Sequence, residues 1–263
     1  FKDAAAAIYG SRAAYGVVLV TTKTGQGEKM VIDFDVSYGS QKALLIPRYV
    51  GSYDYAILRN EAAVNAGQSH PFTDEQLRLI QNGSDPDLYP DNNWYKKTLR
   101  HSAPLYQAEL SVSGGGKTKY FLSGGYMKQG SLLPGKRLDR YSLRANTETR
   151  VSRIFKVGTN ISLVRDEIQS DGGSLNWQEL NRKLPLTVIR QSDGAWGSIT
   201  SGAINTTHAA GNPIRQLEEG GWSKDMTNRF YGTLKGVLQP IPGLEFNGSL
   251  TYNFANGENQ LFK

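Results

Sequence analysis

The stretch "LEFNGSLTYNF", residues 244–254, alternates regularly enough to decide the fold class. Apolar residues occupy every second position except Gly248, and polar residues occupy the positions between them. Successive side chains of a β-strand point to opposite faces, so this stretch predicts a strand with one apolar face and one polar face. The same period recurs in four other runs, at 105–113, 139–150, 155–163 and 228–239.

The length of these runs and the connections between them favour a membrane barrel over a soluble sheet. Each run has about ten residues or more, longer than an ordinary strand and suited to crossing a bilayer at a tilt. Tight turns such as "GGGK" at 114–117 and "IPG" at 241–243 alternate with much longer loops. This asymmetry is typical of bacterial outer-membrane barrels. A soluble β-sandwich also has one apolar face, but it has no reason to sort its loops by length.

The pattern predicts an all-β, antiparallel fold with about seven strands. We expect these strands near residues 29–39, 103–114, 117–128, 138–150, 154–167, 225–239 and 243–257, with long extracellular loops near 40–102 and 168–224. The first loop should contain two helices, at 53–67 and 73–83. Thr73 and Gln76 have the spacing of a capping box, and Gly67 and Gly83 can end the helices.

Composition excludes several classes of protein. The chain is 38% hydrophobic and 21% charged, which is too apolar for a disordered chain. It has no cysteine, which excludes disulfides, thiolate metal sites and a cysteine nucleophile. The net charge of +6 suggests nucleic acid at first, but the basic residues are spread along strands and loops, so we predict no nucleic-acid partner.

No pattern in the sequence predicts an enzyme, a cofactor or a metal site. The stretch "SGGGKT" at 113–118 lacks the first glycine of a phosphate-binding loop, and His70, His101 and His208 lack the spacing of ligands. In the segment 85–91, three aspartates (Asp85, Asp87 and Asp91) offer oxygen atoms that calcium would accept. Two prolines among them favour a rigid turn instead.

Four tryptophans are candidates for ligand binding. Trp94, Trp177, Trp196 and Trp222 all fall in or beside the predicted outer loops. Their flat rings could stack on a sugar or a peptide ligand. Packing within the loops, or anchoring at the membrane interface, is the alternative for each of them.

The opening segment carries the most specific signal. "KDAAAAIYGSRAAYGVVLVTTKTG", residues 2–25, predicts an alanine-rich helix capped by Asp3 and ended by Gly10, followed by a strand. It resembles the last helix–strand segment of the plug domain in TonB-dependent outer-membrane transporters, most of all in the SusC/RagA-like branch. Ala13 and Tyr15 depart from that pattern at the turn. Residues 84–163 are similar to the first barrel hairpins of the same branch.

The resemblance implies a division of the chain into two parts. Residues 1–28 would be the C-terminal end of a plug domain, and residues 29–263 the N-terminal part of a transmembrane β-barrel with 22 strands in total. The chain would then be an internal fragment of a larger protein in the bacterial outer membrane. Asp3 and Arg12 are expected to make polar contacts between the plug and the barrel wall.

The resemblance also implies active import of a nutrient. Typical cargo of this branch is oligosaccharide, and an oligopeptide or a metal chelate is the alternative within the family. The expected partners are the TonB complex, reached through a preceding N-terminal region, a SusD-like surface lipoprotein, and outer-membrane lipid. A soluble β-rich carbohydrate-binding or adhesin module is the remaining alternative.

Overall fold

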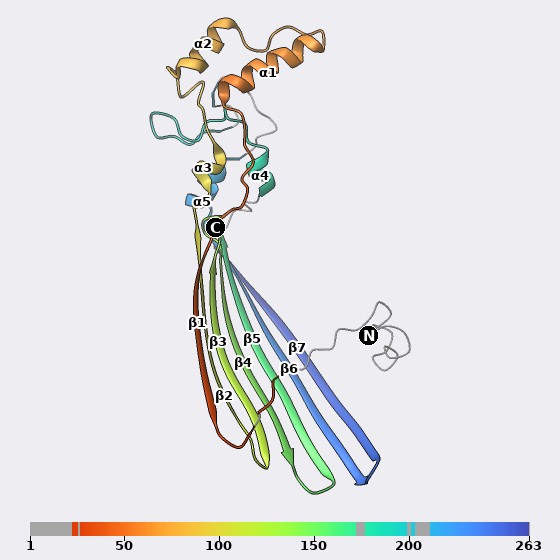
Figure 1. The fold of residues 1–263 in the computed structure, drawn as a ribbon. Helices are drawn as coiled ribbons and strands as arrows, with labels where there is room; N and C mark the ends of the chain where they lie inside the picture. The colour runs from red at the N-terminus through yellow and green to blue at the C-terminus, as the bar shows by residue number, and fades with distance from the viewer. Residues whose placement is uncertain (1–22, 26, 172–176, 199–200, 203–210, 263) are drawn as a thin grey trace.

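The computed structural model of the chain describes residues 23–25, 27–171, 177–198, 201–202 and 211–262. They form a seven-stranded antiparallel sheet in which each strand pairs with its neighbour in sequence (Figure 1). The strands are β1 (Val31–Gln41), β2 (Ala103–Gly114), β3 (Thr118–Gly130), β4 (Arg137–Arg150), β5 (Phe155–Asp171), β6 (Trp222–Ile241) and β7 (Leu244–Phe262). The predicted antiparallel strands are confirmed, and within the described residues β1 and β7 remain the open edges of the sheet.

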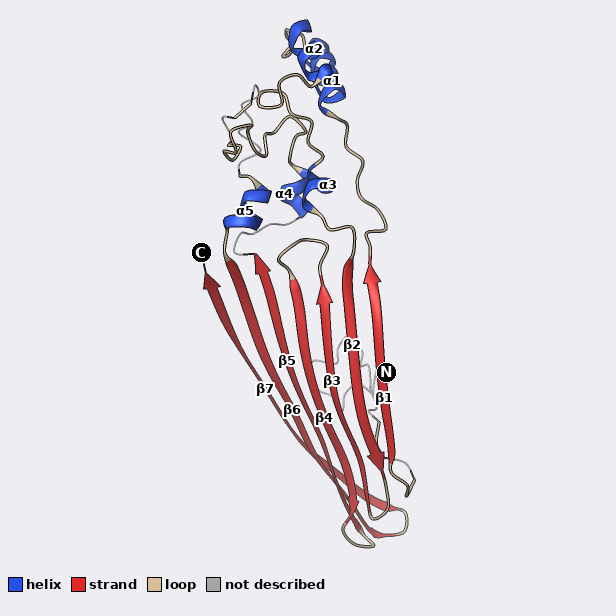
Figure 2. Cartoon of the chain, turned by 90° about the vertical axis from the view of Figure 1, so that its left-hand side faces the viewer, coloured by secondary structure: helices blue, strands red, loops and turns tan. Residues whose placement is uncertain are grey.

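The connections divide between the two ends of the sheet (Figure 2). Short turns join β2 to β3, β4 to β5 and β6 to β7 at one end, which we call the turn end. The helices and the long connections lie at the other end, which we call the loop end. The alternation of short and long connections predicted from the sequence is therefore present in the structure.

The connection between β1 and β2 contains three helices, α1 (Ser52–Asn65), α2 (Asp74–Asn82) and α3 (Trp94–Thr98). The predicted capping box of α2 is confirmed, since Thr73 and Gln76 each accept a hydrogen bond from the other's backbone N–H. Gly83 ends α2 in the left-handed conformation (φ 62°), which glycine adopts without steric cost. The helix α3 was not expected from the sequence.

The connection between β5 and β6 contains α4 (Trp177–Asn181) and α5 (Pro213–Glu219), which also were not expected. This connection packs against the one between β1 and β2. The side chains of Ala56, Phe72, Ile80, Tyr89 and Leu186 form a buried cluster that joins the two. The backbone N–H of Asn92 donates to the carbonyl oxygen of Pro185 (2.9 Å), so backbone bonds also hold the two loops together.

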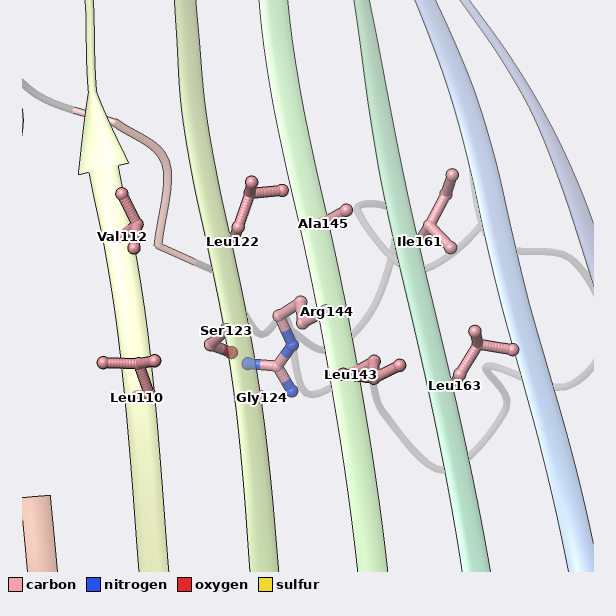
Figure 3. A pocket seen from close by; sticks show the side chains of 10 residues that line it. All are labelled: Leu110, Val112, Leu122, Ser123, Gly124, Leu143, Arg144, Ala145, Ile161 and Leu163. Carbon is pink, nitrogen blue, oxygen red and sulfur yellow. The ribbon is translucent and has the colours of Figure 1, made fainter. Parts of the chain in front are cut away.

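The sheet has one apolar face and one polar face. The apolar face is exposed in the described residues, and its large side chains include Phe34, Leu110, Leu143, Leu163 and Leu250. Figure 3 shows part of this face, where leucines of neighbouring strands surround a shallow hollow at Gly124. A soluble protein rarely exposes an apolar surface of this extent, and this surface therefore requires a covering.

The apolar face forms a diagonal belt across the strands. One row of the pairing register joins Phe34 on β1, through Leu143 on β4, to Phe254 on β7. On β1 the apolar positions run from Ile32 to Tyr38, mostly on the loop-end side of this row, whereas on β7 they run from the row toward the turn end, as far as Leu244. The centre of the belt moves by about six residues, roughly 20 Å, over about 29 Å of sheet width.

With standard strand rise and spacing, this diagonal has a slope of roughly 35°. A membrane is flat, so on tilted strands the apolar segment must shift along the strand axis from each strand to the next. The slope is close to the tilt of about 35–45° that is typical of transmembrane barrels. The belt therefore has the geometry of a lipid-facing surface.

The helix and strand predicted between residues 2 and 22, together with Asp3 and Arg12, lie outside the described residues. Among the helices that the structure describes, none is long and apolar enough to span a bilayer.

Candidate functional site

An arginine–aspartate–arginine cluster lies on the polar face of the sheet. Arg140 on β4 and Asp166 on β5 are register partners, and the Arg140 guanidinium donates to the Asp166 carboxylate from Nε (2.6 Å) and from Nη2 (3.2 Å). Arg229 on β6 donates from Nη1 to the same carboxylate (2.6 Å). Such charge-assisted bonds are the strongest hydrogen bonds in proteins, so Asp166 fixes both guanidinium groups in place.

The cluster presents positive charge outward. The Asp166 side chain is 7% exposed, whereas those of Arg140 and Arg229 are 45% and 37% exposed. Two guanidinium groups against one carboxylate leave a formal charge of about +1. Arg144, four residues from Arg140 on β4, is exposed and forms no ion pair with any residue that the structure describes. The polar face of β4–β6 is therefore basic.

The polar face of β1 and β2 has the opposite charge. Asp35 and Glu109 are direct partners in the register, and Asp33 lies two residues from Asp35 on the same face. Like charges placed opposite each other on neighbouring strands destabilise a sheet. Within the described part of the chain, no basic side chain forms an ion pair with these three carboxylates. The polar face thus changes from acidic to basic across the sheet.

Residues 23–25 contact this polar face near the turn end. The Asn146 side chain on β4 is buried and donates from Nδ2 to the carbonyl oxygen of Lys23 (2.8 Å). A Cβ atom at Gly25 would lie 1.9 Å from the carbonyl oxygen of Gly114 and 2.4 Å from that of Tyr120. No side chain fits there without backbone movement, so this position needs glycine.

The four candidate tryptophans have different surroundings in the structure. Trp94 is 3% exposed and donates from Nε1 to the carbonyl oxygen of Leu184 (3.1 Å), so its ring is used in packing the loops. Trp222 is half-exposed at the loop end of β6 and stacks on Phe262 with ring centroids 6.2 Å apart. The guanidinium of Arg190 lies 3.5 Å from the centroid of the Trp196 ring, and Trp196 Nε1 donates to Glu219.

Trp177 belongs to a stack of three aromatic rings. It is 45% exposed and stacks on Tyr95 (6.0 Å), which in turn stacks on Tyr49 (5.5 Å). Both tyrosine hydroxyls donate to Asn181 Oδ1 on α4. Burial of its ring, and then its contact with Tyr49, raise the pKa of Tyr95 to about 12. The two outer rings of this stack remain accessible to a ligand.

The three aspartates considered for calcium bind separate parts of the loops. Asp85 accepts from the backbone N–H of Leu88 (3.0 Å), and Asp87 accepts from the backbone N–H of Ser192 (2.8 Å). Asp91 accepts from the backbone N–H of Ser52 (2.9 Å), next to the start of α1. Among the described residues, no group of three or more histidine or carboxylate side chains is arranged to hold a metal ion.

The sequence patterns did not predict the arginine–aspartate–arginine cluster. The alternation places Arg140 on the polar face, but it cannot show which residues of β5 and β6 lie beside it. Finding these neighbours requires the register of three strands. The register of β5 against β6 cannot be derived from the sequence, because a loop of about fifty residues separates the two strands.

The chain is similar to known TonB-dependent receptors. No protein-family profile matches it. TonB-dependent receptor P26 of Formosa agariphila is 30% identical over 200 residues, which are 74% of this chain and 19% of the relative. TonB-dependent receptor P3 of the same organism is 30% identical over 162 residues, 61% of this chain and 14% of the relative. The chain thus spans about a fifth or less of the length of these relatives.

Solved structures show the same fold. The RagAB peptide transporter matches with a TM-score of 0.69 and 22% identity, over 96% of this chain and 31% of that chain. The RagAB peptide importer in its open-open state matches with a TM-score of 0.66 and 24% identity, over 98% of this chain and 31% of that chain. The sheet described above therefore has the arrangement of strands found in those larger proteins.

Proposed function

Because the chain belongs to the SusC/RagA-like TonB-dependent receptors, we propose that it is part of a transporter that imports a nutrient across the bacterial outer membrane. The observation that carries this proposal is the two-faced sheet. Its exposed apolar belt crosses the strands on a diagonal, as lipid contact requires, and its other face is polar. The apolar belt faces lipid, and the polar face lines the inside of the barrel.

We assign residues 1–28 to the end of the plug domain and residues 29–263 to the first part of the barrel. The hydrogen bond between Asn146 and Lys23, together with the close approach of Gly25 to Gly114, supports this assignment. Both contacts hold the end of the first segment against the inner wall. Contacts of Asp3 and Arg12 with the wall remain part of the proposal.

The cargo that we propose is an oligosaccharide, captured with a SusD-like lipoprotein and drawn in by the TonB complex. The exposed rings of Tyr49 and Trp177 at the loop end are suited to stacking on a sugar, and Trp196 and Trp222 are further candidates. An oligopeptide is the alternative cargo, because the matching RagAB structures are described as a peptide transporter and importer. The relatives are named as receptors, and we propose no enzymatic activity for this chain.

Uptake by the full-length protein in its native outer membrane tests this function. Cells that carry the transporter should accumulate labelled oligosaccharide, and accumulation should stop when TonB is deleted or the proton gradient is dissipated. A strain without the transporter gene is the matched control. Recovery of the full-length protein from the aqueous fraction without detergent would contradict the proposal and favour a soluble module.

A further inference from the structure

We propose that the cargo is an acidic oligosaccharide, whose carboxylate or sulfate groups bind Arg140, Arg144 and Arg229 on the inner wall of β4–β6. This inference rests on the proposed function, because it assumes that the polar face lines the path of the cargo. The acidic polar face of β1 and β2 then repels the cargo toward β4–β6 of the same wall.

Both guanidinium groups of the cluster are held by Asp166 and still have N–H donors available for a ligand. Arg140 contacts Asp166 through Nε and Nη2, and Arg229 contacts it through Nη1. Each guanidinium has five N–H donors, so several remain for a ligand even though Asp166 already orients both groups. An anion that arrives finds donors that are fixed in advance, and less conformational entropy is lost when it binds.

The three arginines lie on the loop-end side of the contact that residues 23–25 make with β4. Residues 23–25 contact β4 at Asn146, and Arg140 lies six residues closer to the loop end, a distance of about 20 Å along an extended strand. Arg144 lies between these levels and is exposed. The three arginines therefore occupy the wall between the loops, where cargo would enter, and the contact made by residues 23–25.

Arginines of β4 and β6 share register rows with carboxylates of β1 and β2. Arg229 shares a register row with Asp35 and Glu109, and Arg144 shares the next row with Asp33. At each level one side of the wall is acidic and the other is basic. An anionic chain is repelled from β1 and β2 and attracted to β4–β6, and it is most strongly directed at these levels.

The neighbours of the arginines favour a sugar over a peptide. Ser162 is the register partner of both Arg144 and Tyr231, so a guanidinium, a hydroxyl and a half-exposed aromatic ring lie side by side. Stacking on a ring, combined with hydrogen bonds from hydroxyl groups, suits a saccharide carrying a charged substituent.

The test measures ligand binding to the detergent-solubilised full-length transporter by calorimetry. The probes are a galacturonate hexamer and a sulfated galactan oligomer, each compared with a neutral galactan oligomer of the same length, and an oligoglutamate. We expect at least one acidic sugar to bind about tenfold or more tightly than the neutral one. We expect the preference to weaken with salt, because it is electrostatic.

Substitutions then locate the effect. The double variant Arg140→Gln/Arg229→Gln should weaken binding of the acidic sugar about tenfold to hundredfold, because each charge-assisted contact is strong. It should weaken binding of the neutral sugar by a much smaller factor, because a neutral sugar forms no charge-assisted contact with these groups. Arg153→Gln, which removes an exposed charge in the turn between β4 and β5, is the matched control and should behave as wild type. Arg140→Lys/Arg229→Lys, which keeps the charge, should recover part of the loss.

The outcomes separate this inference from the proposed function. If acidic and neutral sugars bind alike, or if the double variant binds the acidic sugar as well as Arg153→Gln does, the inference is wrong while import can still be correct. A preference for oligoglutamate over every acidic sugar would overturn the assignment to saccharides. If the native cells show no TonB-dependent uptake of any cargo, the proposed function itself fails. Heat-modifiable migration on gels verifies that each variant is folded.

Discussion

At the scale of single residues, buried amide side chains hold the loops in place. Asn60 on α1 donates from Nδ2 to the carbonyl oxygen of Phe72 (2.8 Å) and accepts from the backbone N–H of the same residue (2.9 Å). It therefore satisfies both backbone groups of a buried residue, and it joins α1 to the segment that precedes α2. Asn146 has a similar role for Lys23 on the inner wall.

Asn60→Ala should lower the free energy of local opening of the loop between β1 and β2 by about 2 kcal/mol, because a buried N–H and a buried C=O lose their partner together. Hydrogen exchange of the Phe72 amide in the full-length protein measures the change, and we expect much faster exchange. Asn65→Ala, at an exposed position of the same helix, is the control and should have little effect. Equal protection of Phe72 in both variants would contradict this role of Asn60.

At the scale of the element, the strands differ between their two halves. Toward the turn end they alternate between apolar and polar residues, whereas toward the loop end both faces are polar. The outer half of β5 and β6 shows this change, where Glu167 on β5 pairs with Lys224 on β6 (2.8 Å) on the face that is apolar lower down. The strands therefore continue beyond the belt into water.

A charge placed inside the belt should be costly. Leu250 lies within the belt on β7 and is highly exposed in the described structure. Leu250→Arg should lower the free energy of unfolding by about 2–4 kcal/mol if this position lies near the bilayer midplane. The control is Asn253→Arg, on the opposite face of the same strand. Urea unfolding of the full-length protein in lipid vesicles measures both, and equal losses would show that the apolar face does not contact lipid.

The sequence predicts the elements that have a strong period and misses the others for physical reasons. The strands, α1 and α2 follow from alternation and from the capping residues Thr73 and Gly83. The helices α3, α4 and α5 are five to seven residues long, too short for an apolar period to show. β5 and β6 extend past their predicted ends because alternation is lost where both faces meet water. The cluster around Asp166 depends on a register that spacing cannot give.

At the scale of the whole molecule, the open edges of the sheet are the dominant feature. β1 and β7 pair on one side only within the described residues, and β7 is 19 residues long. Each unpaired backbone group costs several kcal/mol inside a bilayer, so a sheet with two free edges is not stable there. The edges must pair with further strands before the belt can be inserted.

Residues 1–263 produced alone should therefore fail to form a membrane-inserted barrel. We expect the isolated chain to aggregate through its two edges, and to show no change in gel migration between unheated and boiled samples. The full-length protein should show that change. A folded, inserted monomer of residues 1–263 would contradict the view that the edges need further strands.

The slope of the belt also determines the diameter of the barrel. Strands inclined at roughly 35° and spaced about 4.8 Å apart each occupy about 5.9 Å of the circumference, so a barrel of the proposed 22 strands would enclose a bore about 40 Å across, measured between backbones. That opening is far wider than a short sugar chain. The barrel therefore cannot select nutrients by their width alone. Discrimination must come from the plug inside the barrel and from the charges on the inner wall.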